Sequence, residues 1–362
     1  MVNSYKNLER SLKTGHHRSV VRHPAFGYVL LGLFLICLQL SFMMGVGPIT
    51  LTISRIIALT MIYTVAAMGL GILVGMAGLI SLGTAAFVGF GAYTAGNLLR
   101  TFTGIPFLLV VIIAIATGVA MGAVIGFISL RVRGLYLLVI TMGFATVMQE
   151  FFQTPNAFTG GWTGITRVPF PTIALFLQLN RETVFFLVLI VMMFLVWLTL
   201  NILHSPTGRA MAAMASSEAL AQAMGIQLLK YRVLAFIIAT AYATVSGVLL
   251  VSSIGAATPH SWTFMLSLNL LAVIILGGGI KPHSIMLGSF FVFGMDVIVW
   301  QRLAFFQRFP GLVMVLSGVL MILIFAKFPG GLTRLVNEVK FFFVRLFLKW
   351  RVYRYGPEPS EV

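Results

Sequence analysis

The chain has 362 residues, of which 59% are hydrophobic and 9% are charged, and its mean hydropathy is +1.04. A soluble protein of this size needs a charged surface around its core, and eight acidic residues do not provide one. No nucleic-acid-binding motif accompanies the net charge of +16, which fits basic flanks of membrane segments that meet anionic lipid.

Apolar runs recur along the chain at about 20 residues, the length that crosses a ~30 Å hydrocarbon layer as a helix. The sequence therefore predicts an all-α, polytopic transmembrane helical bundle. A basic N-terminal segment, residues 1–25, precedes a first run that is too long for a signal peptide, so we expect it to be retained. Ten crossings can be drawn, at residues 26–46, 54–75, 78–99, 107–130, 134–153, 183–203, 232–254, 264–280, 284–302 and 310–327.

Basic residues orient this bundle. With the N-terminus inside, 18 of the 24 Lys and Arg residues fall on the inner side, as the positive-inside rule requires. Both ends of the chain are basic, which predicts that both termini are cytoplasmic and that the span count is even. Glycine-rich stretches at 75–96 and 276–289 indicate broken or re-entrant elements, and without them the count is eight.

Three regions follow from this layout: the basic segment, a membrane domain over residues 26–330, and a basic amphipathic tail over residues 331–362 that we expect on the inner membrane surface. Within the membrane domain, Gly118, Gly122 and Gly126 are spaced for close helix packing.

The polar segment, residues 205–226 (SPTGRAMAAMASSEALAQAMGI), is unusual in so apolar a chain. It lies between the sixth and seventh crossings, in a predicted cytoplasmic loop over residues 204–231. On one helix, its apolar side chains form two narrow stripes, with Met211, Met214 and Ala221 on one side and Leu220 and Met224 nearly opposite. Such a helix fits between its own bundle and a partner, and it fits an ordinary surface helix equally well.

Four blocks resemble the membrane subunits of ABC importers of the branched-chain amino acid permease family. They are residues 69–96 (GLGILVGMAGLISLGTAAFVGFGAYTAG), residues 130–149 with the motif TGGWTGI at 159–165, residues 205–249, and residues 261–279 (SWTFMLSLNLLAVIILGGG). The four blocks occur in the family's order.

The resemblance implies that residues 209–225 form a coupling helix that docks in a groove on a separate ATPase subunit. The implied coupling residues are Arg209, Met211, Met214, Glu218, Ala219 and Gly225. Gly225 lies seven residues after Glu218, one more than in the general permease signature. The Glu218→Arg change is predicted to uncouple transport without unfolding the bundle.

By the same resemblance, the chain is the non-catalytic permease subunit of an ATP-driven importer in the bacterial inner membrane. Its implied partners are ATP-binding subunits that carry ATP and Mg, a homologous second permease or a second copy, a periplasmic solute-binding protein, and membrane lipid; no nucleic acid and no metal is expected. Branched-chain or other amino acids are the leading cargo, while urea, amides and sugars stay open.

Small and polar residues in the spans are candidates for lining the pathway, by backbone exposure at broken helices or by side-chain contact. They are Gly78, Gly83, Gly91, Thr141, Thr146, Asn269 and Asp296. Each is also explained by helix packing or by hydrogen bonding inside the bundle. In the outer loop, Trp162 and Arg167 are candidates for contacting a binding protein, or an interfacial Trp in a solvent loop.

Two other classes of membrane protein fit the sequence less well. An ion-driven secondary transporter needs an intramembrane acid relay, and only Asp296 lies deep in a span, with Glu150 near an end. A membrane enzyme is disfavoured because the chain has no clustered His, Asp or Glu at a membrane face. No GxxxxGK[ST] motif occurs, so the sequence predicts that this chain does not hydrolyse ATP alone.

Overall fold

The computed structural model describes residues 24–43, 51–102, 104–128, 134–155, 158–172, 180, 183–295 and, further on, 315, 318–319, 322–324, 326, 331–335 and 338. The helices are α2 (Pro24–Met43), α3 (Leu51–Gly71), α4 (Thr84–Thr101), α5 (Phe107–Ile128), α6 (Leu135–Gln153), α7 (Val184–His204), α8 (Pro206–Ser216), α9 (Glu218–Ala223), α10 (Leu228–Ile254), α11 (Phe264–Gly277) and α12 (Pro282–Ser289). Shorter elements are η2 (Ile72–Met76), η3 (Gly161–Thr163), η4 (Pro259–Ser261) and η5 (Phe290–Gly294). This part of the chain has no β-strand, as the sequence predicted.

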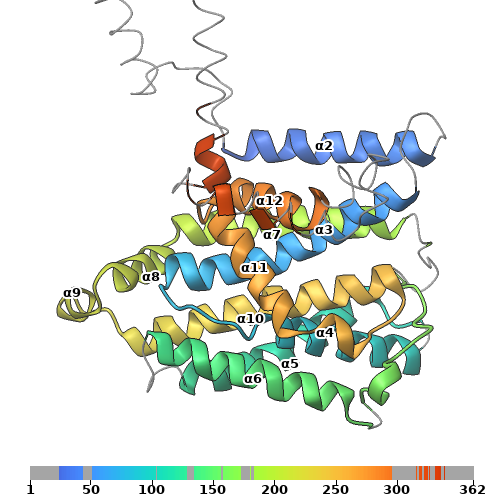
Figure 1. The fold of residues 1–362 in the computed structure, drawn as a ribbon, viewed down its shortest axis with the longest axis horizontal. Helices are drawn as coiled ribbons and strands as arrows, with labels where there is room; N and C mark the ends of the chain where they lie inside the picture. The colour runs from blue at the N-terminus through green and yellow to red at the C-terminus, as the bar shows by residue number, and fades with distance from the viewer. Residues whose placement is uncertain are drawn as a thin grey trace, which may run out of the picture.

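Most of the long helices run side by side in one bundle, with α8 and α9 projecting at one end and the loop after α6 at the opposite end (Figure 1). Five helical stretches among the described residues are long and apolar enough to cross a membrane. They are Leu51–Met76, Phe107–Ile128, Val184–His204, Leu228–Ile254 and Pro259–Gly277, with shorter apolar helices at Gly27–Ser41 and Pro282–Gly294. The total number of spans, ten or eight, and the cytoplasmic location of both termini stay predictions.

Helix α10 lies at the centre of the bundle. It packs against α3, α4 and α5. Of the residues in its most apolar stretch, 72% are buried, compared with 28% for α5 and 33% for α7. The outward faces of α5 and α7 carry exposed large apolar side chains such as Leu108 and Ile190. Such faces suit a lipid environment, whereas α10 needs protein on all sides.

Glycines, which have no side chain, let helix α5 approach α10 closely. A Cβ added at Gly118 of α5 would lie 2.9 Å from the Thr244 Cβ, and one at Gly122 would lie 2.8 Å from the Thr240 Cβ. One at Gly126 would meet Phe236 at 3.2 Å. The predicted packing role of this glycine face is therefore confirmed, since no larger residue fits these crossings.

The first glycine-rich stretch breaks its helix, as the sequence indicated. Helix α3 continues into the π-helical turn η2, and residues 77–83 leave the helix before α4 begins at Thr84. The hydroxyls of Thr141 on α6 and Ser267 on α11 accept hydrogen bonds from the N–H groups of Leu82 (3.0 Å) and Ala85 (2.9 Å). These two bonds satisfy backbone donors that the start of a helix otherwise leaves unpaired.

The second glycine-rich stretch is also broken. Helix α11 ends at Gly277, Gly278 adopts a φ of +74°, and α12 begins at Pro282. The Thr333 hydroxyl lies 2.6 Å from the Gly277 carbonyl oxygen, to which it donates, and 2.9 Å from the Ser284 hydroxyl. Residues 331–335 therefore cover this turn and satisfy an open carbonyl at the end of α11.

The structure corrects several predicted boundaries. The crossing drawn at 78–99 begins at Thr84 instead, because residues 77–83 are not helical. The one drawn at 264–280 ends at Gly277, where glycine takes the left-handed conformation that terminates a helix. The crossing drawn at 310–327 falls largely outside the described residues. The same holds for residues 296–302 of the crossing drawn at 284–302 and for most of both terminal regions.

Candidate functional site

The polar segment forms two helices, which corrects the single helix expected over 209–225. Helix α8 ends at Ser216, Ser217 is extended (φ −160°, ψ 113°), and α9 begins at Glu218. The Ser217 side chain accepts a hydrogen bond from the Leu220 N–H at 3.4 Å, which makes it the N-cap of α9. A serine favours this break because its hydroxyl replaces the backbone partner that the interruption removes.

Helix α8 is packed against one end of the bundle. Its Met211 is fully buried and Met214 is 2% exposed. A Cβ at Gly208 would lie 2.8 Å from the Met76 methyl group of η2, and one at Gly78 would lie 3.1 Å from the Ala215 Cβ. The broken stretch after α3 therefore meets α8 directly, and Gly78, with a φ of +68°, allows this approach.

Helix α9 presents the second stripe outward. Ala221 is buried, whereas Leu220 is 69% exposed and Met224 is 82% exposed. The apolar residues of the polar segment therefore divide into the buried and exposed sets that the sequence indicated, although they lie on two helices instead of one.

Gly225 ends α9 in a hydrogen-bonded cap. With a φ of +78°, its N–H donates to the Gln222 carbonyl, and the Ile226 N–H donates to the Ala221 carbonyl, both at 2.9 Å. These two bonds are the pattern of a Schellman motif, which requires a residue in the left-handed conformation at this position. Gly225 therefore sets where α9 ends.

The acidic residue of the segment faces its own chain. The Glu218 carboxylate forms an ion pair with the guanidinium of Arg232, near the start of α10. Arg209 is exposed and donates to the His204 carbonyl oxygen at 3.2 Å, and Ala219 is exposed. The positive-inside count placed Arg232 among the inner-side charges, and its position fourteen residues after Glu218 was the available signal for the pair.

The pathway candidates are distributed over several helices of the bundle. Gly83 packs near α6, where a Cβ would lie 3.4 Å from the Thr141 carbonyl oxygen, while Gly91 packs on Thr244 of α10. Thr141 is buried and Asn269 is half-buried. Thr146 is exposed on α6 and donates to the Met142 carbonyl at 3.1 Å. Packing and capping account for Gly83, Gly91 and Thr141; a lining role for any of the set stays a prediction, and Asp296 lies outside the described residues.

The outer loop, residues 159–172, is held at the end opposite α9 (Figure 1). Ile165 and Ala257 exchange backbone hydrogen bonds of 2.9 and 2.8 Å, which tie the loop to the chain after α10. Trp162 is 65% exposed, and its ring lies 5.6 Å from that of His260, a neighbour that the sequence analysis missed. Arg167 is exposed with a φ of +58°, so the loop presents Trp162 and Arg167 to the outside of the bundle.

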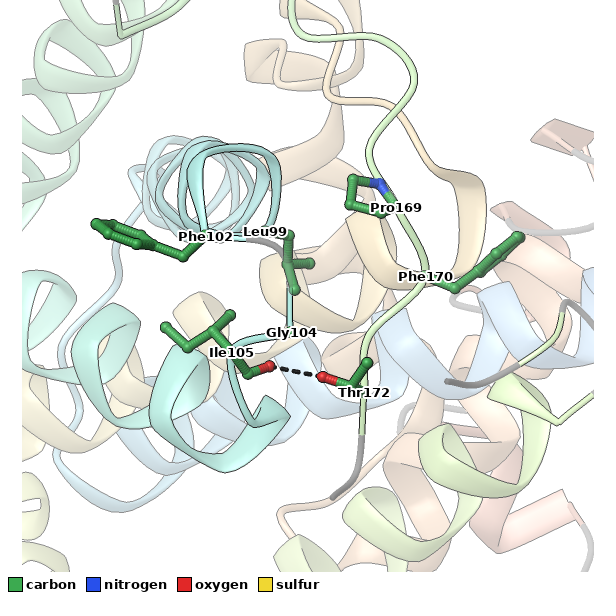
Figure 2. Close-up of a pocket in the computed structure, with 7 residues that line it drawn as sticks. All are labelled: Leu99, Phe102, Gly104, Ile105, Pro169, Phe170 and Thr172. Carbon is green, nitrogen blue, oxygen red and sulfur yellow. Dashed lines mark hydrogen bonds between the residues drawn. The ribbon is translucent and has the colours of Figure 1, made fainter. Parts of the chain in front are cut away.

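A small hollow lies beside this loop (Figure 2). Its lining residues are Leu99, Phe102, Gly104, Ile105, Pro169, Phe170 and Thr172. The Thr172 hydroxyl donates to the Ile105 carbonyl at 2.8 Å, so its polar group is engaged within the wall (Figure 2). None of these lining residues carries a charge, and a free amino acid needs partners for both its charged groups, so the hollow does not suit one.

Apolar helices long enough to cross a membrane, broken helices in the bundle and a polar two-helix segment at one end are typical of a multi-pass membrane protein. The sequence model of the permease component of branched-chain amino acid transport systems matches residues 52–325. This chain belongs to that family, which confirms the resemblance seen in the sequence.

Two curated relatives support the same assignment. The high-affinity branched-chain amino acid transport system permease proteins LivM of Salmonella typhimurium and of Escherichia coli are each 29% identical to the chain over 338 residues. In both comparisons the match covers 87% of this chain and 76% of the relative. No solved structure matched the chain significantly.

Proposed function

We propose that this chain is the membrane-spanning permease subunit of an ATP-driven importer of branched-chain amino acids in the bacterial inner membrane. It carries no ATPase activity of its own, and ATP and Mg bind to separate ATP-binding subunits. A second permease subunit, homologous or identical, completes the pathway, and a periplasmic solute-binding protein delivers the cargo to the outer loop.

The observation that carries this proposal is the two-sided packing of the polar segment. Met211 and Met214 fasten α8 to the bundle, while Leu220 and Met224 expose large apolar side chains on a short helix at its end. An isolated six-residue helix is unstable in water, and exposed Leu and Met on such a helix suit a groove on a partner protein. The family assignment supports the ATP-binding subunit as that partner.

Branched-chain amino acids are proposed as cargo because the matching family and both LivM relatives are described by that cargo. The purified complex, reconstituted with its ATP-binding subunits and binding protein in liposomes, is expected to accumulate labelled leucine only when ATP is present inside. Labelled urea and glucose are the matched control solutes. Leucine uptake by the permease alone, abolished by collapsing the proton gradient, would instead indicate a secondary transporter.

The proposal places α8 and α9 in the cytoplasm and the outer loop in the periplasm. A Ser217→Cys variant, made in a chain whose exposed Cys37 is replaced by alanine, is therefore expected to resist a membrane-impermeant thiol reagent in intact spheroplasts and to react in inverted vesicles. A Trp162→Cys variant in the same background should show the opposite pattern. Labelling of the Ser217→Cys variant in intact spheroplasts would contradict the proposed orientation.

A further inference from the structure

The ion pair between Glu218 and Arg232 joins a helix that projects from the bundle to the helix at its centre. The Arg232 side chain is 4% exposed, compared with 38% for Glu218. The Arg232 Nε atom is buried and has no hydrogen-bond partner within the described part of the chain. Losing the carboxylate would leave a buried charge without compensation, which is strongly destabilising, so we expect the pair to stay closed in the folded protein.

Helix α9 is short and buries little of its own surface within the described part of the chain. It is six residues long, and Ala221 is its buried residue. It is separated from α8 by the extended Ser217, and a Cβ at Gly225, where it ends, would meet nothing within 4 Å. Glu218, at the first position of α9, is paired with a side chain of α10, so we expect a displacement of α9 to pull on this pair.

Arg232 belongs to a helix that packs closely against α4 and α5. Helices α4 and α10 approach each other closely. A Cβ added at Gly91 would lie 2.8 Å from the Thr244 Cα, and one added at Gly247 would lie 2.7 Å from the Ala92 nitrogen. Together with the glycines of α5, these contacts make α10 move with α4 and α5 or not at all, because closely packed interiors transmit displacement. A force on Arg232 therefore reaches the middle of the membrane domain.

We propose that Glu218 and Arg232 are the intramolecular link through which α9 moves α10 during transport, an inference that rests on the proposed function. Glu218 is then a positioning residue that faces its own bundle, and Leu220 and Met224 make the contact with the ATP-binding subunit. ATP-driven movement of α9 passes through the ion pair into α10, and Ser217 absorbs the change of angle relative to α8.

The test exchanges the charges in the complete complex in proteoliposomes, with ATP inside and leucine-loaded binding protein outside. The variants are Glu218→Arg, Arg232→Glu and the double variant with both changes. Each complex is measured for bound ATP-binding subunit, ATP hydrolysis and leucine taken up per ATP. Both single variants should retain the ATP-binding subunit. Uptake per ATP should fall about tenfold, which lies within the range of coupling factors between two linked sites. The double variant should recover at least half of the wild-type ratio.

The control is an exchange at Arg334 and Glu338, an exposed pair on the tail with 59% and 54% of the side chains accessible, which should leave uptake per ATP unchanged. If a single variant does not yield folded protein, uptake per ATP is measured for Glu218→Gln and Arg232→Gln instead.

Unchanged uptake per ATP in the single variants would overturn the link. Loss of the ATP-binding subunit in Glu218→Arg, without recovery in the double variant, would make Glu218 a partner contact instead. A wild-type complex without any ATP-binding subunit would overturn the proposed function itself.

Discussion

Replacing Gly91 with valine is expected to abolish the recovery of folded protein from the membrane. A Cβ at this position would overlap the Thr244 carbonyl oxygen and lie 2.8 Å from the Thr244 Cα, and backbone atoms do not rotate away as a side chain does. Helices α4 and α10 would have to separate at the centre of the bundle. Such overpacking costs about 3 kcal/mol or more, a large part of the stability of a typical domain.

The measurement is the fraction of detergent-extracted protein that elutes as a single peak in size-exclusion chromatography, together with its Tm. Gly143→Val is the matched control, because Gly143 also lies within a long helix of the membrane domain, and a Cβ there would meet nothing within 4 Å. The control should elute as the wild type does. Equal recovery of the two variants would show that α4 and α10 do not pack as closely as described.

Replacing Leu220 and Met224 together with glutamate is expected to abolish leucine uptake and binding of the ATP-binding subunit, while the bundle remains folded. Both side chains are largely exposed, at 69% and 82%, so charges there do not disturb the core. In a protein interface, each central apolar residue contributes about 2 kcal/mol, so losing both weakens binding about a thousandfold. The measurement is the amount of ATP-binding subunit that co-purifies with an affinity-tagged permease.

The matched control introduces the same two charges at exposed polar positions of the same loop, Gln222→Glu with Gln227→Glu. This variant should retain the ATP-binding subunit and most of the uptake. Retention of the subunit by the Leu220 and Met224 variant would place the docking surface elsewhere. An unchanged Tm in both variants separates a lost interface from lost folding.

Much of the architecture was predictable because it depends on local pattern. Apolar length predicted the membrane helices, and the four-residue spacing of Gly118, Gly122 and Gly126 predicted the face that packs on α10. Concentrated glycine predicted the breaks after α3 and α11, because glycine weakens helices and adopts positive φ. The sequence also indicated which apolar residues of the polar segment would be buried and which exposed, as Met211 and Leu220 are, although it placed them on one helix.

Tertiary structure alone decided which polar groups meet. The sequence placed Arg232 among the inner-side charges, because the positive-inside rule counts basic residues without assigning them partners. Only the packing of α9 on α10 pairs it with Glu218. Similarly, Thr141 is a polar residue in a span until the fold brings its hydroxyl to the Leu82 N–H, at the start of another helix.

The sequence by itself therefore determined the class of protein, the placement of most helices and the faces that they bury, because hydrophobic length and periodicity are properties of neighbouring residues. The tertiary structure decided the division of the polar segment at Ser217, the link from Glu218 to Arg232 and the meeting of Trp162 with His260. Each of these depends on a hydrogen bond, charge or ring contact whose partner is chosen by how whole helices pack, and that choice is not written in any one stretch of sequence.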